Sequence, residues 1–113
     1  MKNIILVLMV SFLGLSMNAQ EVKKNKNAQY TIEVNGNCEQ CQKRIQKAAL
    51  SVSGVKQASW SIETHRLKFI LNEEKNTVIN VEKAIAKVGH DTEAVKANIN
   101  DYDNLHTCCK YER

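Results

Sequence analysis

The feature that most constrains the fold of this chain is a repeated change in apolar periodicity along residues 29–97. Apolar residues alternate with polar ones over residues 29–34, which is typical of a half-buried strand. They then recur every three or four residues over 39–52, as in an amphipathic helix. Two more alternating runs, a second helical run and a short run with weak alternation follow, over residues 58–62, 67–71, 78–88 and 92–97.

This order predicts an α+β fold of the ferredoxin-like βαββαβ type, a four-stranded antiparallel sheet with two helices on one face. Trp60 and Phe69 are expected in the core. His65 falls in the polar turn between the second and third strands. We expect it at the surface, at the end of the sheet opposite the loop that follows the first strand. The fold class itself leaves the function open.

The first nineteen residues differ in character from the rest of the chain. Lys2 precedes an apolar run over residues 4–15, and Ala19 is a candidate cleavage residue. Because a membrane span needs about 20 apolar residues, this pattern favours a cleaved signal peptide over an uncleaved anchor. We therefore expect a periplasmic or secreted protein with no stable membrane insertion. The expected division of the chain is 1–19 signal peptide, 20–28 polar leader, 29–97 domain and 98–113 Cys-containing C-terminal tail.

The net charge of +4 is only a weak basic bias. The sequence has no basic helix and no row of aromatic residues for stacking on bases. Nucleic acid is therefore not expected as a partner.

All four cysteines lie in the part expected to be exported: Cys38, Cys41, Cys108 and Cys109. An even number in an oxidising compartment suggests disulfides. However, a bond within either pair would close only a tiny loop, and a bond between neighbouring cysteines would be strained. Cross-links between the two pairs remain an alternative.

Cys38 and Cys41 fall at the junction between the first strand's loop and the first helix. Both sulfurs can point into one small volume, where the helix amino end lowers thiol pKa values. Two thiolates suit a soft ion that accepts two ligands, with Cu(I) as the first candidate and Hg(II) as the second. Structural zinc needs four ligands, and the spacing of Cys108 and Cys109 is not that of a second zinc knuckle.

A C-x-x-C pair also serves thiol–disulfide exchange, so a redox protein is the alternative from another class. The thioredoxin layout requires a proline facing the thiols, and this sequence contains no proline. Metal binding is therefore the favoured interpretation.

The Cys38–Cys41 motif, "SGV" at 53–55 and "VGHD" at 88–91 together resemble the heavy-metal-associated domain family. That family includes copper chaperones, domains of soft-metal-transporting ATPases and periplasmic mercury-binding proteins. The resemblance implies that Cys38 and Cys41 bind one soft ion and pass it on by ligand exchange, without catalysis. The implied partner is a soft-metal transporter or another metal-binding domain, and a metal-bridged homodimer is a further candidate.

We therefore expect an exported Cu(I) carrier or sequestering protein, with a periplasmic Hg(II) carrier for a mercury transporter as the alternative. One position departs from the family pattern, because Gly36 stands where the family has a methionine that tethers the loop. The departure predicts a more mobile loop.

Further candidate ligands lie outside the C-x-x-C motif. The resemblance places the loop of His90 beside the metal loop, so His90 is either a third ligand, a neighbour that tunes the site, or a solvated turn residue. In the tail, Cys108 and Cys109 could complete a site of three or four sulfurs, form a second site with His106, or relay the ion. Otherwise the tail simply packs against the domain through Tyr102, Leu105 and Tyr111.

Overall fold

The computed structural model describes residues 23–113. The predicted signal peptide and residues 20–22 of the predicted leader lie outside the described residues. Within residues 23–113, the helices are too short or too polar to cross a membrane.

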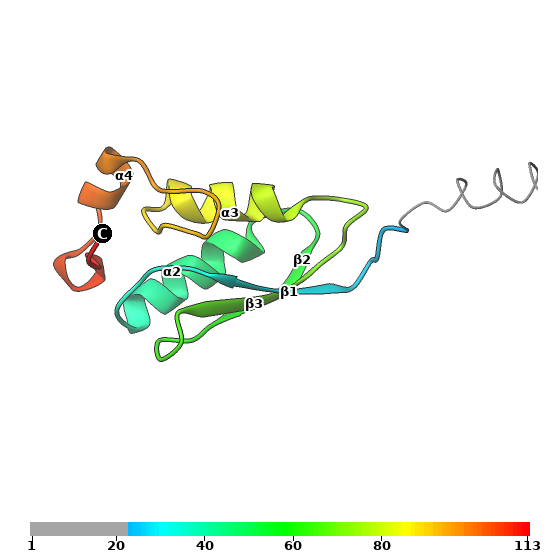
Figure 1. The fold of residues 1–113 in the computed structure, drawn as a ribbon, viewed down its shortest axis with the longest axis horizontal. Helices are drawn as coiled ribbons and strands as arrows, with labels where there is room; N and C mark the ends of the chain where they lie inside the picture. The colour runs from blue at the N-terminus through cyan, green and yellow to red at the C-terminus, as the bar shows by residue number, and fades with distance from the viewer. Residues whose placement is uncertain (1–22) are drawn as a thin grey trace, which may run out of the picture.

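The centre of the fold is an antiparallel sheet in the order β1-β3-β2. Its strands are β1 (Ala28–Glu33), β2 (Val55–Trp60) and β3 (Arg66–Leu71). The helices α2 (Glu39–Leu50) and α3 (Val78–Lys87) cover one face of the sheet (Figure 1). The predicted ferredoxin-like α+β class is confirmed.

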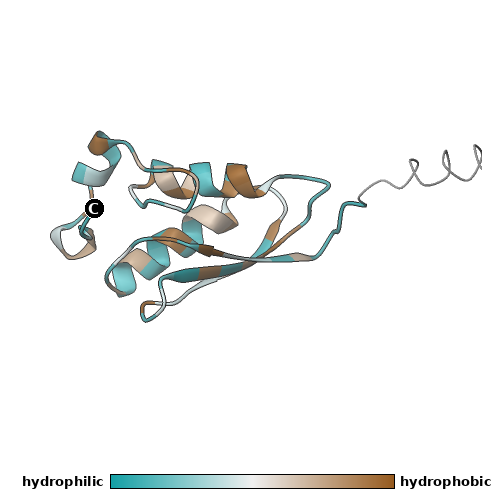
Figure 2. Ribbon diagram, in the orientation of Figure 1, coloured by the Kyte–Doolittle hydropathy of each residue, from teal (hydrophilic) through white to brown (hydrophobic). Residues whose placement is uncertain are grey.

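The core forms where the predicted apolar faces meet. Ile32, Leu67 and Phe69 point inward from β1 and β3 and are at most 5% exposed. They pack against helix residues such as Ile45 and Ile85, which are fully buried. Brown apolar residues accordingly alternate with teal polar residues along the strands and the helices (Figure 2).

The prediction of a fourth strand over residues 92–97 is wrong. In this part of the chain, Thr92 forms only an isolated antiparallel bridge with Val34, the residue that follows β1. The backbone of Thr92 instead donates to the carbonyl of Val95 at 2.8 Å, and the Thr92 hydroxyl accepts from the Val95 amide at 3.1 Å. These local bonds close a turn and compete with ladder pairing.

The expected position of His65 is also wrong. The Val34 amide donates to the His65 carbonyl at 2.8 Å, which places the β2–β3 turn beside the end of β1 that leads to Cys38. The reason is topological: β1 and β2 both pair antiparallel to β3, so they run in the same direction and end at the same edge. His65 is half-buried, with its ring stacked on Trp60 at 5.7 Å between centroids.

The tail forms two short helical segments, α4 (Ile99–Asp103) and η1 (Thr107–Cys109), and folds back toward the start of α2 (Figure 1). Leu105 and Tyr111 are buried and Tyr102 is half-buried, so the tail packs against the domain through the three residues of the packing alternative. Gly89 allows this approach, because a Cβ there would lie 2.9 Å from Leu105, and its φ of +104° favours glycine.

Candidate metal centre

Cys38 and Cys41 lie together at the amino end of α2. Cys38 is the residue that precedes the helix, with extended backbone angles, and Cys41 is buried in the first turn. Their sulfurs are 3.5 Å apart. The Asn37 amide donates to the Cys41 sulfur at 3.4 Å, which ties the loop to the first turn of α2.

Trp60 fills the space beneath the thiol loop. A Cβ at Gly36 would lie 3.0 Å from the Trp60 ring and 3.1 Å from the Cys41 Cβ, so a larger side chain fits there only if these neighbours shift. The Trp60 indole also donates to the Val34 carbonyl at 2.9 Å. We expected the loop to lack a tether, but the Trp60 side chain, which comes from β2, packs beneath the loop and tethers it.

The tail brings two more thiols to the same place. The Cys38 sulfur lies 3.6 Å from the sulfur of Cys108 and 3.6 Å from that of Cys109. The two tail sulfurs are 3.9 Å apart. Among residues 23–113, the group of three or more ligand atoms that could hold a metal ion is Cys38, Cys108 and Cys109, all within 4.8 Å of one another.

The thiols differ in acidity. Burial raises the pKa of Cys38, but hydrogen bonds from the backbone and side chain of Cys41 and from the tail thiols outweigh this and lower it from 9.0 to about 7. The hydrogen bond with Cys38 raises the pKa of Cys108, and burial raises that of Cys109. Cys38 is therefore the first of these three thiols to ionise, and all four cysteines are free thiols.

The two candidate histidines lie outside the sulfur group. His90 is fully buried, and its Nδ1 is 2.8 Å from the carbonyl oxygen of Asn35 in the thiol loop. His90 therefore lies beside the thiol loop as a buried neighbour and is not a solvated turn residue. His106 is exposed and precedes η1.

Sequence reasoning missed the contacts that hold the tail in place. Arg113 forms a bidentate ion pair with Asp91 at 2.9 and 3.0 Å, and its guanidinium lies over the Tyr102 ring. The hydroxyl of Tyr111 donates to the Gly89 carbonyl and accepts from the Asp91 amide, both at 2.8 Å. In the sequence, the aromatic and charged residues of the tail are the indication that it packs against the domain.

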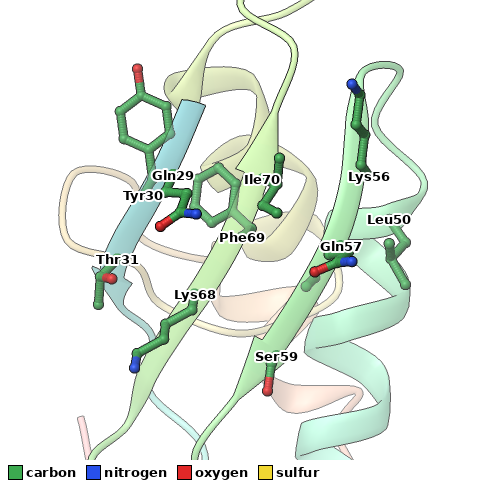
Figure 3. A pocket seen from close by; sticks show the side chains of 11 residues that line it. Gln29, Tyr30, Thr31, Leu50, Lys56, Gln57, Ser59, Lys68, Phe69 and Ile70 are labelled. Carbon is green, nitrogen blue, oxygen red and sulfur yellow. The ribbon is translucent and has the colours of Figure 1, made fainter. Parts of the chain in front are cut away.

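A shallow hollow of about 550 Å³ lies on the sheet (Figure 3). Side chains from all three strands line it, together with Leu50 of α2. Its lining contains no cysteine or histidine, so this hollow is separate from the sulfur cluster.

The fold and the thiol loop both have counterparts among known proteins. The family model of the heavy-metal-associated domain matches residues 31–91, more than half of the chain. A comparison with curated proteins found no match.

Three solved structures illustrate the similarity of fold. The CopZ metallochaperone is 24% identical, with 57% of this chain and 98% of that chain covered and a TM-score of 0.56. The N-terminal domain of a potential copper-translocating P-type ATPase from Bacillus subtilis, in the Cu(I)-loaded state, is 21% identical, with 58% and 84% covered and a TM-score of 0.56. Oxidised MerP from Ralstonia metallidurans CH34 is 25% identical, with 58% and 96% covered and a TM-score of 0.52.

The family match begins in β1, includes the thiol loop and both covering helices, and ends just after His90. The chain therefore belongs to the heavy-metal-associated domain family, which binds metal ions and is not enzymatic.

Proposed function

We propose that this protein is an exported carrier or sequestering protein for Cu(I), bound through Cys38 and Cys41. The observation that carries the proposal is the pair of sulfurs 3.5 Å apart at the amino end of α2. Thiolates are soft ligands that select Cu(I) over harder ions. The low pKa of Cys38, about 7, makes a thiolate available near neutral pH.

Transfer to a partner requires one sulfur that the partner can reach. Cys41 is fully buried, whereas Cys38 is half-buried at the edge of the loop. Cys38 is therefore the ligand that a partner's thiol would approach first, and Cys41 the one that retains the ion until the exchange is complete. The similarity to a Cu(I)-loaded ATPase domain supports a transporter domain as the partner.

Export is supported by the sequence of residues 1–19. Mass spectrometry of the protein recovered from the periplasm or the medium should find a chain that begins after Ala19. Recovery of the chain with residues 1–19 still attached would contradict cleavage.

Metal binding is tested by titrating the reduced protein with Cu(I) under anaerobic conditions, in competition with a colorimetric Cu(I) chelator. The parent and the control Lys43→Ser, which changes an exposed residue of the same helix, should each bind one ion. Cys38→Ser/Cys41→Ser should not compete with the chelator. Equal binding by that double variant would overturn the proposal.

Two other outcomes would change the assignment. If the parent binds Hg(II) but fails to compete for Cu(I), the cargo is Hg(II). If it instead turns over a disulfide substrate catalytically, the protein belongs to the thiol–disulfide redox class.

A further inference from the structure

The tail thiols lie against the metal loop although about seventy residues separate them in the chain. Cys38 is the centre of the cluster, since its sulfur is within 3.6 Å of the sulfurs of Cys41, Cys108 and Cys109. Cys109 is fully buried, whereas Cys108 is exposed and donates to Gln40 at 3.3 Å. One thiol thus closes the cluster from the inside and the other from the solvent side.

Contacts that involve no sulfur hold the tail in this position. On one side of the pair, Leu105 packs against Gly89. On the other side, Tyr111 bonds to the backbone of residues 89 and 91, and Arg113 pairs with Asp91. The tail thiols are therefore positioned before any ion binds, which lowers the entropy lost when they become ligands.

The spacing of the sulfurs distinguishes two modes of coordination. A thiolate sulfur lies about 2.3 Å from a zinc ion, and this length serves as a yardstick for soft ions of similar size. Two sulfurs on opposite sides of such an ion would be about 4.6 Å apart, whereas three around it in a plane would be about 4.0 Å apart. The observed separations of 3.6, 3.6 and 3.9 Å fit the three-sulfur arrangement.

The Cys38–Cys41 pair fits the linear arrangement less well. Its separation of 3.5 Å would have to increase by about 1 Å to place an ion between opposed sulfurs. Cys41 has little freedom to move, because it is fully buried and its sulfur accepts from the Asn37 amide. The three-sulfur site needs an expansion of only about 0.4 Å or less in each sulfur–sulfur separation.

We propose that Cys38, Cys108 and Cys109 form a three-thiolate site for a soft cation, with the C-terminal tail as a lid over the C-x-x-C loop. The inference rests on the proposed function, because both sites share Cys38. An ion held by Cys38 and Cys41 exchanges its bond to Cys41 for bonds to the two tail sulfurs. The tail thiols release their two protons to solvent, Cys41 takes up one, and no electron is transferred.

This arrangement gives the tail a role in retention and release. With the lid closed, the exposed approach to Cys38 is occupied by Cys108, so a partner's thiol must displace the tail to reach the ion. A lid that opens on contact with the partner keeps the ion bound until then. The protein with a closed lid therefore sequesters the ion, and lifting the lid converts it to a carrier.

The test uses Cu(I) as the probe and compares three proteins, all reduced and anaerobic. They are the parent, Cys108→Ser/Cys109→Ala, and the control Lys110→Ser, which changes an exposed residue beside the pair. Alanine at the buried position avoids leaving an unpaired hydroxyl there. Copper K-edge X-ray absorption gives the sulfur coordination number, and competition with a chelator gives the affinity.

The parent and Lys110→Ser should show three sulfur neighbours, and Cys108→Ser/Cys109→Ala two. The double variant should still bind one ion, with an affinity at least about tenfold weaker than that of the parent. Two sulfur neighbours in the parent would overturn the three-thiolate site whether or not the variant folds, while leaving the proposed function intact. Failure of the proposed function appears separately, as undiminished binding by Cys38→Ser/Cys41→Ser.

Discussion

The Nδ1 of His90 lies 2.8 Å from the carbonyl oxygen of Asn35, and this contact ties the loop after α3 to the loop that carries the thiols. Because a carbonyl oxygen only accepts, Nδ1 donates and Nε2 keeps its lone pair. Nε2 is buried and has no hydrogen-bond partner among residues 23–113. Burial lowers the pKa of His90 and the charge of Arg44 lowers it further, against the opposite effects of Asn35 and Asp91.

The stability of the metal-free protein should therefore decrease as the pH falls below about 6.5. Unfolding restores the ordinary pKa of His90, so at acidic pH the unfolded chain binds more protons than the folded one. The resulting slope is at most about 1.4 kcal/mol per pH unit. The ring of Tyr111 also stacks on His90, and burial raises the pKa of Tyr111 to about 12, so it stays neutral over this range.

Urea unfolding at several pH values between about 5 and 8 measures this slope. The matched variant is His90→Gln, which keeps a side-chain donor for Asn35 but does not titrate. Its unfolding free energy should vary less with pH than that of the parent. Parallel curves for the two proteins would show that His90 does not contribute.

Cys38 should be alkylated before the more exposed Cys108. The thiolate is the reactive form, and the pKa of Cys38 is lowered to about 7, while that of Cys108 is raised. Its iodoacetamide rate should rise with pH and reach half its maximum near pH 7. Peptide mass spectrometry over time compares the two cysteines within one sample, and faster labelling of Cys108 at pH 7 would contradict the order.

Gly36 and Trp60 should behave as a coupled pair. Gly36→Ala places a Cβ 3.0 Å from the Trp60 ring and should destabilise the protein by about 1–3 kcal/mol, because the core there is already filled. Trp60→Leu creates room beneath the loop, so Gly36→Met should cost less in the Trp60→Leu background than in the parent. Urea unfolding of the parent, Gly36→Met, Trp60→Leu and the double variant yields the coupling energy. If the two changes in unfolding free energy simply add, the two side chains do not share this space.

The apolar pattern of the sequence correctly predicted the strands and helices that bury one face along their length. The alternation around Ile32 and Phe69 and the helical spacing around Ile45 gave correct strands and a correct helix, because each element buries one face. The strand predicted over 92–97 failed because the hydroxyl and backbone of Thr92 satisfy the chain locally. Apolar alternation was weak there, so nothing favoured ladder pairing over the turn.

The candidate site was predictable only in part. The C-x-x-C motif indicates Cys38 and Cys41 as candidate ligands, because the two thiols are only three residues apart in the sequence. The approach of Cys109 to Cys38 depends on contacts across the fold, such as Tyr111 with Gly89, which no periodicity encodes. The tether from Trp60 was hidden for the same reason, since the residue is an ordinary core tryptophan until the strand register is known.

Tyr111→Phe should loosen the tail while leaving the domain folded. The substitution keeps the ring that stacks on His90 at 5.6 Å but removes the hydroxyl that bonds to Gly89 and Asp91. Two buried backbone groups then lack partners, which should cost the docked state about 1–3 kcal/mol. Because Cys109 is buried only while the tail is docked, a thiol reagent should modify it roughly tenfold faster for each 1.4 kcal/mol lost.

The matched control is Tyr30→Phe, which also loses a tyrosine hydroxyl bond, here to Glu73, in the strand before the thiol loop rather than in the tail. It should leave the reactivity of Cys109 unchanged. Circular dichroism verifies that both variants keep the helices of the domain. If Cys109 reacts at the parent rate in Tyr111→Phe, the hydroxyl does not hold the tail, and Leu105 with Arg113 must be sufficient to keep the two thiols on Cys38.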